Sequence, residues 1–160
     1  MDIYQTRTKR NVINYRLATP LEAQQLSQVF SLAYEPYRLS ISDLPDVSGG
    51  LKENITNDVV WVAETSKQVV GGIVLVRDHN LFYLANIAVH SDFHSRGIAR
   101  GLISVLQAHV VAEGGEKIDL ATHIDMPENV AIYERLGWQV TGRKGNKVFV
   151  VKDVGPQTSC

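Results

Sequence analysis

The chain has 160 residues, about the length of one domain, and its apolar and charged fractions of 44% and 21% are those of an ordinary soluble globular protein. Sixteen basic and seventeen acidic residues give a net charge of -1, which argues against nonspecific nucleic-acid binding. The only cysteine, Cys160, excludes an intrachain disulfide, and no signal-peptide pattern or bilayer-length apolar run occurs in the sequence. We therefore expect a single cytoplasmic domain over residues 1–160, with no nucleic-acid or membrane partner.

The first predicted elements are a strand and a helix. Residues 1–12 are polar and are expected to form a loose arm or the approach to a first strand, which residues 15–18 provide. Residues 19–22 (TPLE) fit a capping box with proline in the first turn, so a helix begins there. We expect Pro36 to end this helix. Its predicted buried stripe consists of Ala23, Leu26, Phe30 and Ala33.

The following connection, residues 34–58, is predicted to be irregular because it contains two prolines and a glycine pair. It includes one short helix over residues 51–57 and two aromatic side chains, Tyr34 and Tyr37, that we expect to be exposed. Connections of this length in a compact domain are often lids or binding loops, although a solvated surface excursion is the simpler alternative.

The central residues predict three strands joined by short turns. Residues 59–64 and 69–76 are rich in β-branched side chains and form a hairpin, and residues 81–89 follow a turn at 78–80. The Gly71-Gly72 pair within the second strand indicates a bulge or the close approach of another backbone.

A helix is predicted to begin near Gly97, because apolar residues then recur with helical spacing. These residues are Ile98, Leu102, Val105, Leu106 and Val110. Glycines at 114 and 115 end the helix, and the crossover leads into a strand over residues 118–123 that we expect to be parallel to the strand over residues 81–89.

The last predicted elements are a short helix and a hairpin. The helix follows Pro127 and ends at Gly137, and strands over residues 138–142 and 147–151 form the hairpin. Residues 153–160 are expected to be a frayed tail. Antiparallel neighbours followed by a helical crossover predict an α/β fold with a mixed, mostly antiparallel sheet.

The turn between residues 89 and 98 is the strongest candidate for a binding site. The first N–H groups of a helix have no partners within the helix and carry the positive end of its dipole, so they attract anions. Gly97 lets the backbone approach a ligand, Ala99 is small, and Arg96 and Arg100 add positive charge. We expect this turn to bind a phosphate or pyrophosphate.

The segment His94–Ala99 (HSRGIA) resembles the Q/R-x-x-G-x-G/A signature of the GCN5-related N-acetyltransferases, the GNAT superfamily, with His94 in place of the usual Gln or Arg. Residues 128–138 (ENVAIYERLGW) resemble the family's second signature, N-x-x-A-x-x-x-Y-x-x-x-G-[FW], with Tyr133 closer to Asn129 than in this longer pattern. The resemblance covers about residues 13–152 and looks like that of bacterial members of unassigned substrate. It implies a sheet of about seven strands, flanked by helices and splayed between its two central parallel strands.

The resemblance also implies acetyl-CoA as cosubstrate and assigns the site. The main chain of three strand residues would hold the pantetheine, the following loop the pyrophosphate, and Asn129 the pantetheine arm from the other side. The strand residues are Ile87, Ala88 and Val89, and the loop residues are His94, Ser95, Arg96, Gly97, Ile98, Ala99 and Arg100.

Tyr133 is predicted to be the catalytic general acid that protonates the departing thiolate, since a phenol with a pKa near ~10 can donate without ionising first. The alternative is a core aromatic residue. No carboxylate lies in the strand over residues 81–89, so the amine would lose its proton to a water chain. Candidate ends of that chain are His123, Asp125, Asp43 and Asp46.

The sequence thus predicts an acetyl-CoA-dependent N-acetyltransferase that acts by direct attack of a small-molecule primary amine in a ternary complex. No covalent acyl-enzyme and no metal site are expected, because cysteine occurs only in the tail and no Cys/His set has metal spacing. A protein N-terminal or lysine acetyltransferase and a non-catalytic acyl-CoA sensor are the alternatives. A nucleotide-binding regulator lacks the expected glycine motifs. A homodimer is left open.

Overall fold

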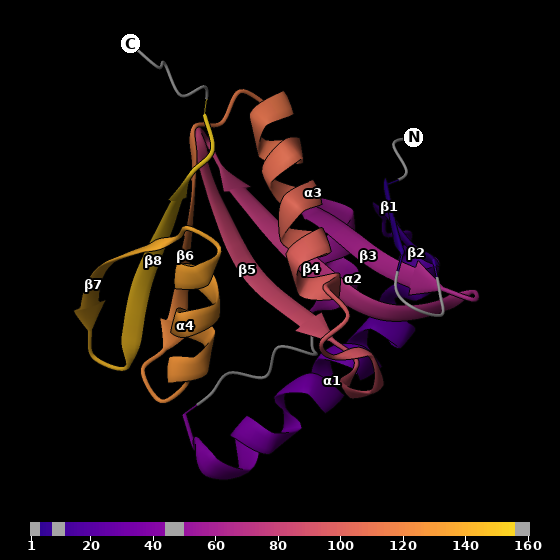
Figure 1. Cartoon of the computed structure of the whole chain (residues 1–160), viewed down its shortest axis with the longest axis horizontal. Helices are drawn as coiled ribbons and strands as arrows, with labels where there is room; N and C mark the ends of the chain where they lie inside the picture. Colours follow the sequence, from indigo (N-terminus) through magenta and orange to yellow (C-terminus); the bar gives the residue numbers. More distant parts are fainter. Residues whose placement is uncertain (1–3, 8–11, 44–49, 156–160) are drawn as a thin grey trace. The chain divides into compact units, whose positions relative to one another are not determined.

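The computed structural model describes residues 4–7, 12–43 and 50–155 (Figure 1), so Asp46 and Cys160 lie outside the described residues. The chain divides into two compact units. Unit 1 comprises Met1–Leu75 and Asn86–Leu106, and unit 2 comprises Val76–Ala85 and Gln107–Cys160. The boundaries between the units fall within three elements: the strands Gln68–Asp78 and Leu81–Val89 and the helix Ile98–Ala112.

The observed elements agree closely with the predicted order. The strands are β1 (Tyr4–Arg7), β2 (Val12–Leu17), β3 (Val59–Thr65), β4 (Gln68–Asp78), β5 (Leu81–Val89), β6 (Lys117–His123), β7 (Gln139–Lys144) and β8 (Lys147–Asp153). The helices are α1 (Ala23–Ser40), α2 (Leu51–Asn57), α3 (Ile98–Ala112) and α4 (Pro127–Arg135), with short 3-10 turns η1 (Pro20–Glu22) and η2 (Ser91–Phe93).

The fold is of the predicted α/β class, with a mixed and mostly antiparallel sheet. In unit 1, β1, β2, β3 and β4 are successive antiparallel neighbours. In unit 2 the order is β5, β6, β8, β7, and the parallel register joins Tyr83 of β5 to Asp119 of β6. The part of the chain that the structure describes holds eight strands, against about seven expected, because the polar residues of β1 pair with β2 along the edge.

Helix α1 is longer than predicted, and the expectation that Pro36 ends it is wrong. The helix continues to Ser40 with Pro36 inside it. Pro36 and Leu32, the residue four positions earlier, are both exposed, so water can replace the N–H that proline lacks. The helix starts as predicted: the Thr19 N–H donates to the Glu22 carboxylate at 2.7 Å.

The paired glycines of β4 let helices pack closely on both faces of the strand. A Cβ added to Gly71 would lie 3.3 Å from side chains of Ile98 and Leu102 in α3, and 3.1 Å from the Ala88 carbonyl oxygen. A Cβ on Gly72 would collide with Leu26 of α1. Successive strand residues point to opposite faces, so α1 covers one face of β4 and α3 the other.

Both predicted reasons for this glycine pair are therefore confirmed. Another backbone does approach Gly71, as the Ala88 carbonyl shows. The β3–β4 register also shifts between Ala63 and Glu64, which pair with Gly71 and Val69 and leave Val70 as the extra residue of a bulge. The apolar stripe predicted for α3 is buried at every position.

In unit 2, α4 packs on β6 and β8 (Figure 1). The expectation of a frayed tail from residue 153 is wrong in part. Strand β8 runs through Asp153, and the N–H groups of Val154 and Gly155 donate to the Glu116 carbonyl at 2.8 and 3.0 Å. Residues 156–160 lie outside the described residues.

Candidate active site

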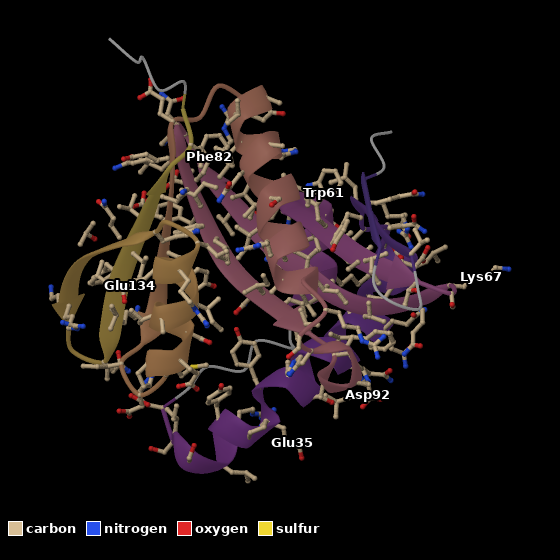
Figure 2. The ribbon with its side chains drawn as sticks, viewed as in Figure 1. Glu35, Trp61, Lys67, Phe82, Asp92 and Glu134 are labelled. Carbon is tan, nitrogen blue, oxygen red and sulfur yellow. The ribbon has the colours of Figure 1, made fainter. Side chains whose placement is uncertain are left out.

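The loop between β5 and α3 is held by a hydrogen bond to β4 and by contacts among its own residues. The His90 N–H donates to the Val70 carbonyl of β4 at 2.7 Å, and its Nδ1 accepts the Asp92 N–H at 3.1 Å. Its ring meets Phe93 edge to face, with 5.9 Å between centroids, and the Arg96 guanidinium lies 5.0 Å from the Phe93 ring centroid. Asp92 is on the outer side of this loop (Figure 2). The loop therefore leads into α3 as an ordered segment.

The residues before α3 form a backbone turn with two left-handed residues, a conformation typical of the concave turns that bind anions. Ser95 and Gly97 both have positive φ, 63° and 77°, and a Cβ on Gly97 would meet nothing within 4 Å. The helix begins as predicted, with the Gly101 N–H donating to the Gly97 carbonyl at 2.9 Å. The three N–H groups between these residues precede the first intrahelical bond.

This turn has the properties of a phosphate site. His94, Ser95, Arg96, Gly97 and Arg100 are exposed, Ala99 is partly exposed and Ile98 is anchored in the core. The first turn of α3 contains Arg100 and no acidic residue. Free backbone donors, the positive helix end and arginine charge together fit a phosphate-bearing ligand.

Strand β5 directs alternate backbone groups to opposite edges. Since the His90 N–H points to β4, alternation points the polar groups of Ala88 and Asn86 to β4 as well, and those of Ile87 and Val89 to the other edge. Two side chains reach carbonyls on that other edge. His94 Nε2 donates to the Val89 carbonyl at 3.0 Å, and the Tyr34 hydroxyl lies 3.4 Å from the Ile87 carbonyl.

The expectation that Tyr34 is an exposed residue of an irregular connection is wrong. Both Tyr34 and Tyr37 are half-buried rather than exposed. Because α1 continues through Pro36, Tyr34 is a helical residue whose hydroxyl lies 3.5 Å from Asn86 Oδ1. Neither Tyr34 nor Asn86 was among the predicted site residues. The sequence signal that could have identified Asn86 is its position as the one amide side chain in the apolar run LFYLANIAV.

In unit 2, α4 positions the other two predicted residues. Tyr133 is buried, with 7% of its surface exposed, and its ring packs against Trp138 at 5.3 Å between centroids. Asn129 is half-buried, and its Nδ2 lies 3.5 Å from Thr122 Oγ1 and 3.9 Å from the Met126 sulfur. Asn129 therefore carries a polar group from α4 to the end of β6.

Of the candidate ends for a water chain, His123 and Asp125 lie together. His123 is buried at 9% exposure, and its Nδ1 accepts the Asp125 N–H at 3.0 Å. Asp125 Oδ2 lies 3.8 Å from the same nitrogen. This contact gives His123 a structural role in the turn after β6, and a proton-transfer role stays a prediction.

The described residues also bear on metal sites and membrane spans. Within the described ranges, no three His, Cys, Asp or Glu side chains gather as a metal site would require. No helix in those ranges combines the length and the apolar character needed to cross a bilayer.

The strand, the concave turn and the helix define an α/β protein that can bind a phosphate-bearing ligand. The model of the acetyltransferase (GNAT) family matches residues 25–138, and the chain belongs to this family. It is therefore an acetyltransferase with acetyl-CoA as cosubstrate.

The proteins that are similar to this chain include other acetyltransferases. An acetyltransferase of Sodalis glossinidius is 33% identical over 96 residues, which cover 60% of this chain and 68% of the relative. The PaiA N-acetyltransferase of Thermoplasma acidophilum, solved in complex with coenzyme A, matches with a TM-score of 0.77 at 14% identity, over 88% of this chain and 98% of that one. The ribosomal-protein-S18-alanine N-acetyltransferase of Escherichia coli matches with a TM-score of 0.75 at 14% identity, over 92% and 99%.

Proposed function

We propose that this acetyltransferase is a cytoplasmic N-acetyltransferase, a single domain over residues 1–160, that acetylates the primary amine of a small molecule by direct attack in a ternary complex. The observation that carries the proposal is the concave turn at Ser95–Gly97, which opens directly onto the first N–H groups of α3. The pyrophosphate of acetyl-CoA binds there, contacted by residues 94–100.

The pantetheine then runs along the edge of β5 that faces away from β4. Strand alternation leaves the N–H groups of Ile87 and Val89 for it, and directs the main-chain groups of Ala88 to β4. Ala88 lies between them, and its carbonyl oxygen is beside Gly71 of β4. Asn129, whose amide nitrogen makes long contacts of 3.5 and 3.9 Å, contacts the pantetheine arm.

The chemistry follows from the leaving group. A neutral amine attacks the thioester carbon, the new C–N bond forms, and the C–S bond breaks to release a thiolate. Tyr133 gives its phenol proton to this sulfur and regains one from water, while the proton lost by the amine passes to water. His123 and Asp125 are the described candidates for the end of the water chain, and Asp43 on the turn after α1 is a third.

The test is whether the protein binds acetyl-CoA at this turn and releases its thiol. Acetyl-CoA should raise the melting temperature, while ATP and NAD should not. Gly97→Glu, which adds bulk and negative charge where the pyrophosphate binds, should abolish that rise. Gly114→Glu is the matched control, because Gly114 also has positive φ (82°) and open space but lies at the opposite end of α3.

Thiol release with a panel of amines and peptides then separates the alternatives. Release with small primary amines supports the proposal. Release only with peptides would establish a protein N-terminal or lysine acetyltransferase. Binding without release for every acceptor would indicate an acyl-CoA sensor, and equal thermal shifts from all three ligands a nucleotide-binding regulator.

A further inference from the structure

The Tyr34 hydroxyl of α1 lies beside both the Asn86 side chain and the Ile87 carbonyl of β5. It is 3.5 Å from Asn86 Oδ1, whose side chain rises from the strand face, and 3.4 Å from the Ile87 carbonyl, which points to the edge away from β4. The proposed path of the pantetheine follows that edge. Three oxygens therefore converge next to the strand segment that would carry the thioester.

These three oxygens are not satisfied by one another. The tyrosine hydroxyl has one proton, and its two neighbours are both acceptors, so it can donate fully to only one of them. Both distances are also about 0.7 Å longer than an ordinary O–H···O hydrogen bond. Such spacing leaves acceptor capacity for the N–H groups of a ligand, and contacts of this kind tighten when the ligand binds.

The fold itself does not require this polar pair. Asparagine is depleted in strands, and the side chains two positions away in β5, Leu84 and Ala88, are buried and apolar. Helix α1 is already anchored by the buried residues Leu26, Val29 and Phe30. A leucine at position 86 and a phenylalanine at position 34 would satisfy packing alone.

We infer that Tyr34, Asn86 and the Ile87 carbonyl form the subsite that receives the nitrogen of the acceptor, and that they select a primary amine. The inference rests on the proposed function. A nitrogen about 2.9 Å from two of these oxygens donates an N–H to each, which leaves its lone pair for the thioester carbon. A secondary amine has only one N–H and a hydroxyl only one O–H, so neither makes both bonds.

The subsite is neutral, which suits a nucleophile that must lose its charge. Burial, with a smaller contribution from Tyr37, raises the pKa of Tyr34 to about 12, so its hydroxyl stays protonated and is not a base. Neutral oxygens bind the uncharged amine and accept stronger hydrogen bonds as positive charge develops on nitrogen during attack. As the C–N bond forms, one of the two N–H groups leaves its oxygen partner and gives its proton to water, as in the mechanism above.

Steady-state thiol release from acetyl-CoA tests this subsite, with n-butylamine, benzylamine and tyramine as acceptors. Tyr34→Phe and Asn86→Leu should each raise the KM for the amine about 3- to 10-fold, the loss expected for one hydrogen bond. Acetyl-CoA should raise the melting temperature of both variants as much as that of the wild type. Ser40→Ala removes a hydroxyl from the same helix that bonds only to the Pro36 and Tyr37 carbonyls at 3.4 and 3.3 Å, so it should leave KM unchanged.

Asn86→Asp distinguishes recognition of the amine from support of the fold. A carboxylate at this position attracts the ammonium form, so the KM for all three amines should fall about 3- to 10-fold, which a purely structural role would not produce. Unchanged KM values in Tyr34→Phe and Asn86→Leu, with active wild type, would overturn the subsite while leaving the proposed function intact. No thiol release by wild type with any of the three amines would overturn both.

Discussion

At the scale of single residues, Tyr133 has two candidate roles, one in core packing and one in proton transfer. It is buried against Trp138, as a core aromatic residue would be, and it is also the residue that we propose as the general acid. A substitution that keeps the ring separates the two roles, because packing depends on the ring and proton transfer on the hydroxyl.

Tyr133→Phe should therefore lower kcat about 100-fold or more, the usual contribution of a positioned general acid. The phenylalanine ring keeps its contact with Trp138, so the affinity for acetyl-CoA should stay close to wild type. Single-turnover thiol release and calorimetric titration measure the two quantities. Wild-type kcat in this variant would assign Tyr133 to the core alone.

At the scale of elements, a side-chain hydrogen bond connects the loop between β5 and α3 to the end of β5. His94 occupies the position where family members usually have Gln or Arg, and its Nε2 donates to the Val89 carbonyl at 3.0 Å. This bond closes the loop over five residues and fixes the direction in which residues 95–97 enter α3. The side chain thus orders the turn through the backbone.

His94→Ala should weaken acetyl-CoA binding about 3- to 10-fold, since it removes one hydrogen bond that holds the turn. His94→Gln keeps an N–H donor on a side chain of similar length and should stay within about 2-fold of wild type. Isothermal titration with acetyl-CoA gives both dissociation constants. Equal affinity in the alanine variant would show that the turn holds its shape without this bond.

The boundaries of the strands and helices show how much of the fold the sequence could predict. Strand β5 begins and ends where predicted, and α3 begins within one residue, because apolar periodicity and a positive-φ glycine fix those boundaries locally. The end of α1 could not be predicted, because whether a helix continues through Pro36 depends on solvent exposure of that turn. Tyr34 could not be predicted as a site residue either. Its contact with Asn86 joins residues 52 positions apart, which no local pattern encodes.

At the scale of the whole molecule, one partly buried ionic cluster joins three elements of unit 1. Arg16 of β2 makes a two-point contact with the Glu22 carboxylate at the start of α1, and its Nη2 lies 2.7 Å from Glu64 Oε2 of β3. Burial alone would raise the pKa of Glu22, but hydrogen bonds from Arg16 and from the Thr19 N–H outweigh it, and the net pKa is lowered. The charged carboxylate is therefore favoured in the folded state.

This shift predicts a dependence of stability on pH. A carboxylate with a lowered folded-state pKa contributes stability that is present above its unfolded pKa, about 4.3, and is lost as the pH falls through the folded value. The free energy of unfolding should thus decrease below about pH 5, and Glu22→Gln should remove part of that decrease and cost about 1–3 kcal/mol at pH 7. Glu113→Gln breaks the more exposed Arg77 pair, 3.2 Å long, and should change stability by less than about 0.5 kcal/mol. Urea unfolding of the three proteins between pH 3 and pH 7 measures this, and parallel curves for wild type and Glu22→Gln would show that the cluster does not couple proton binding to folding.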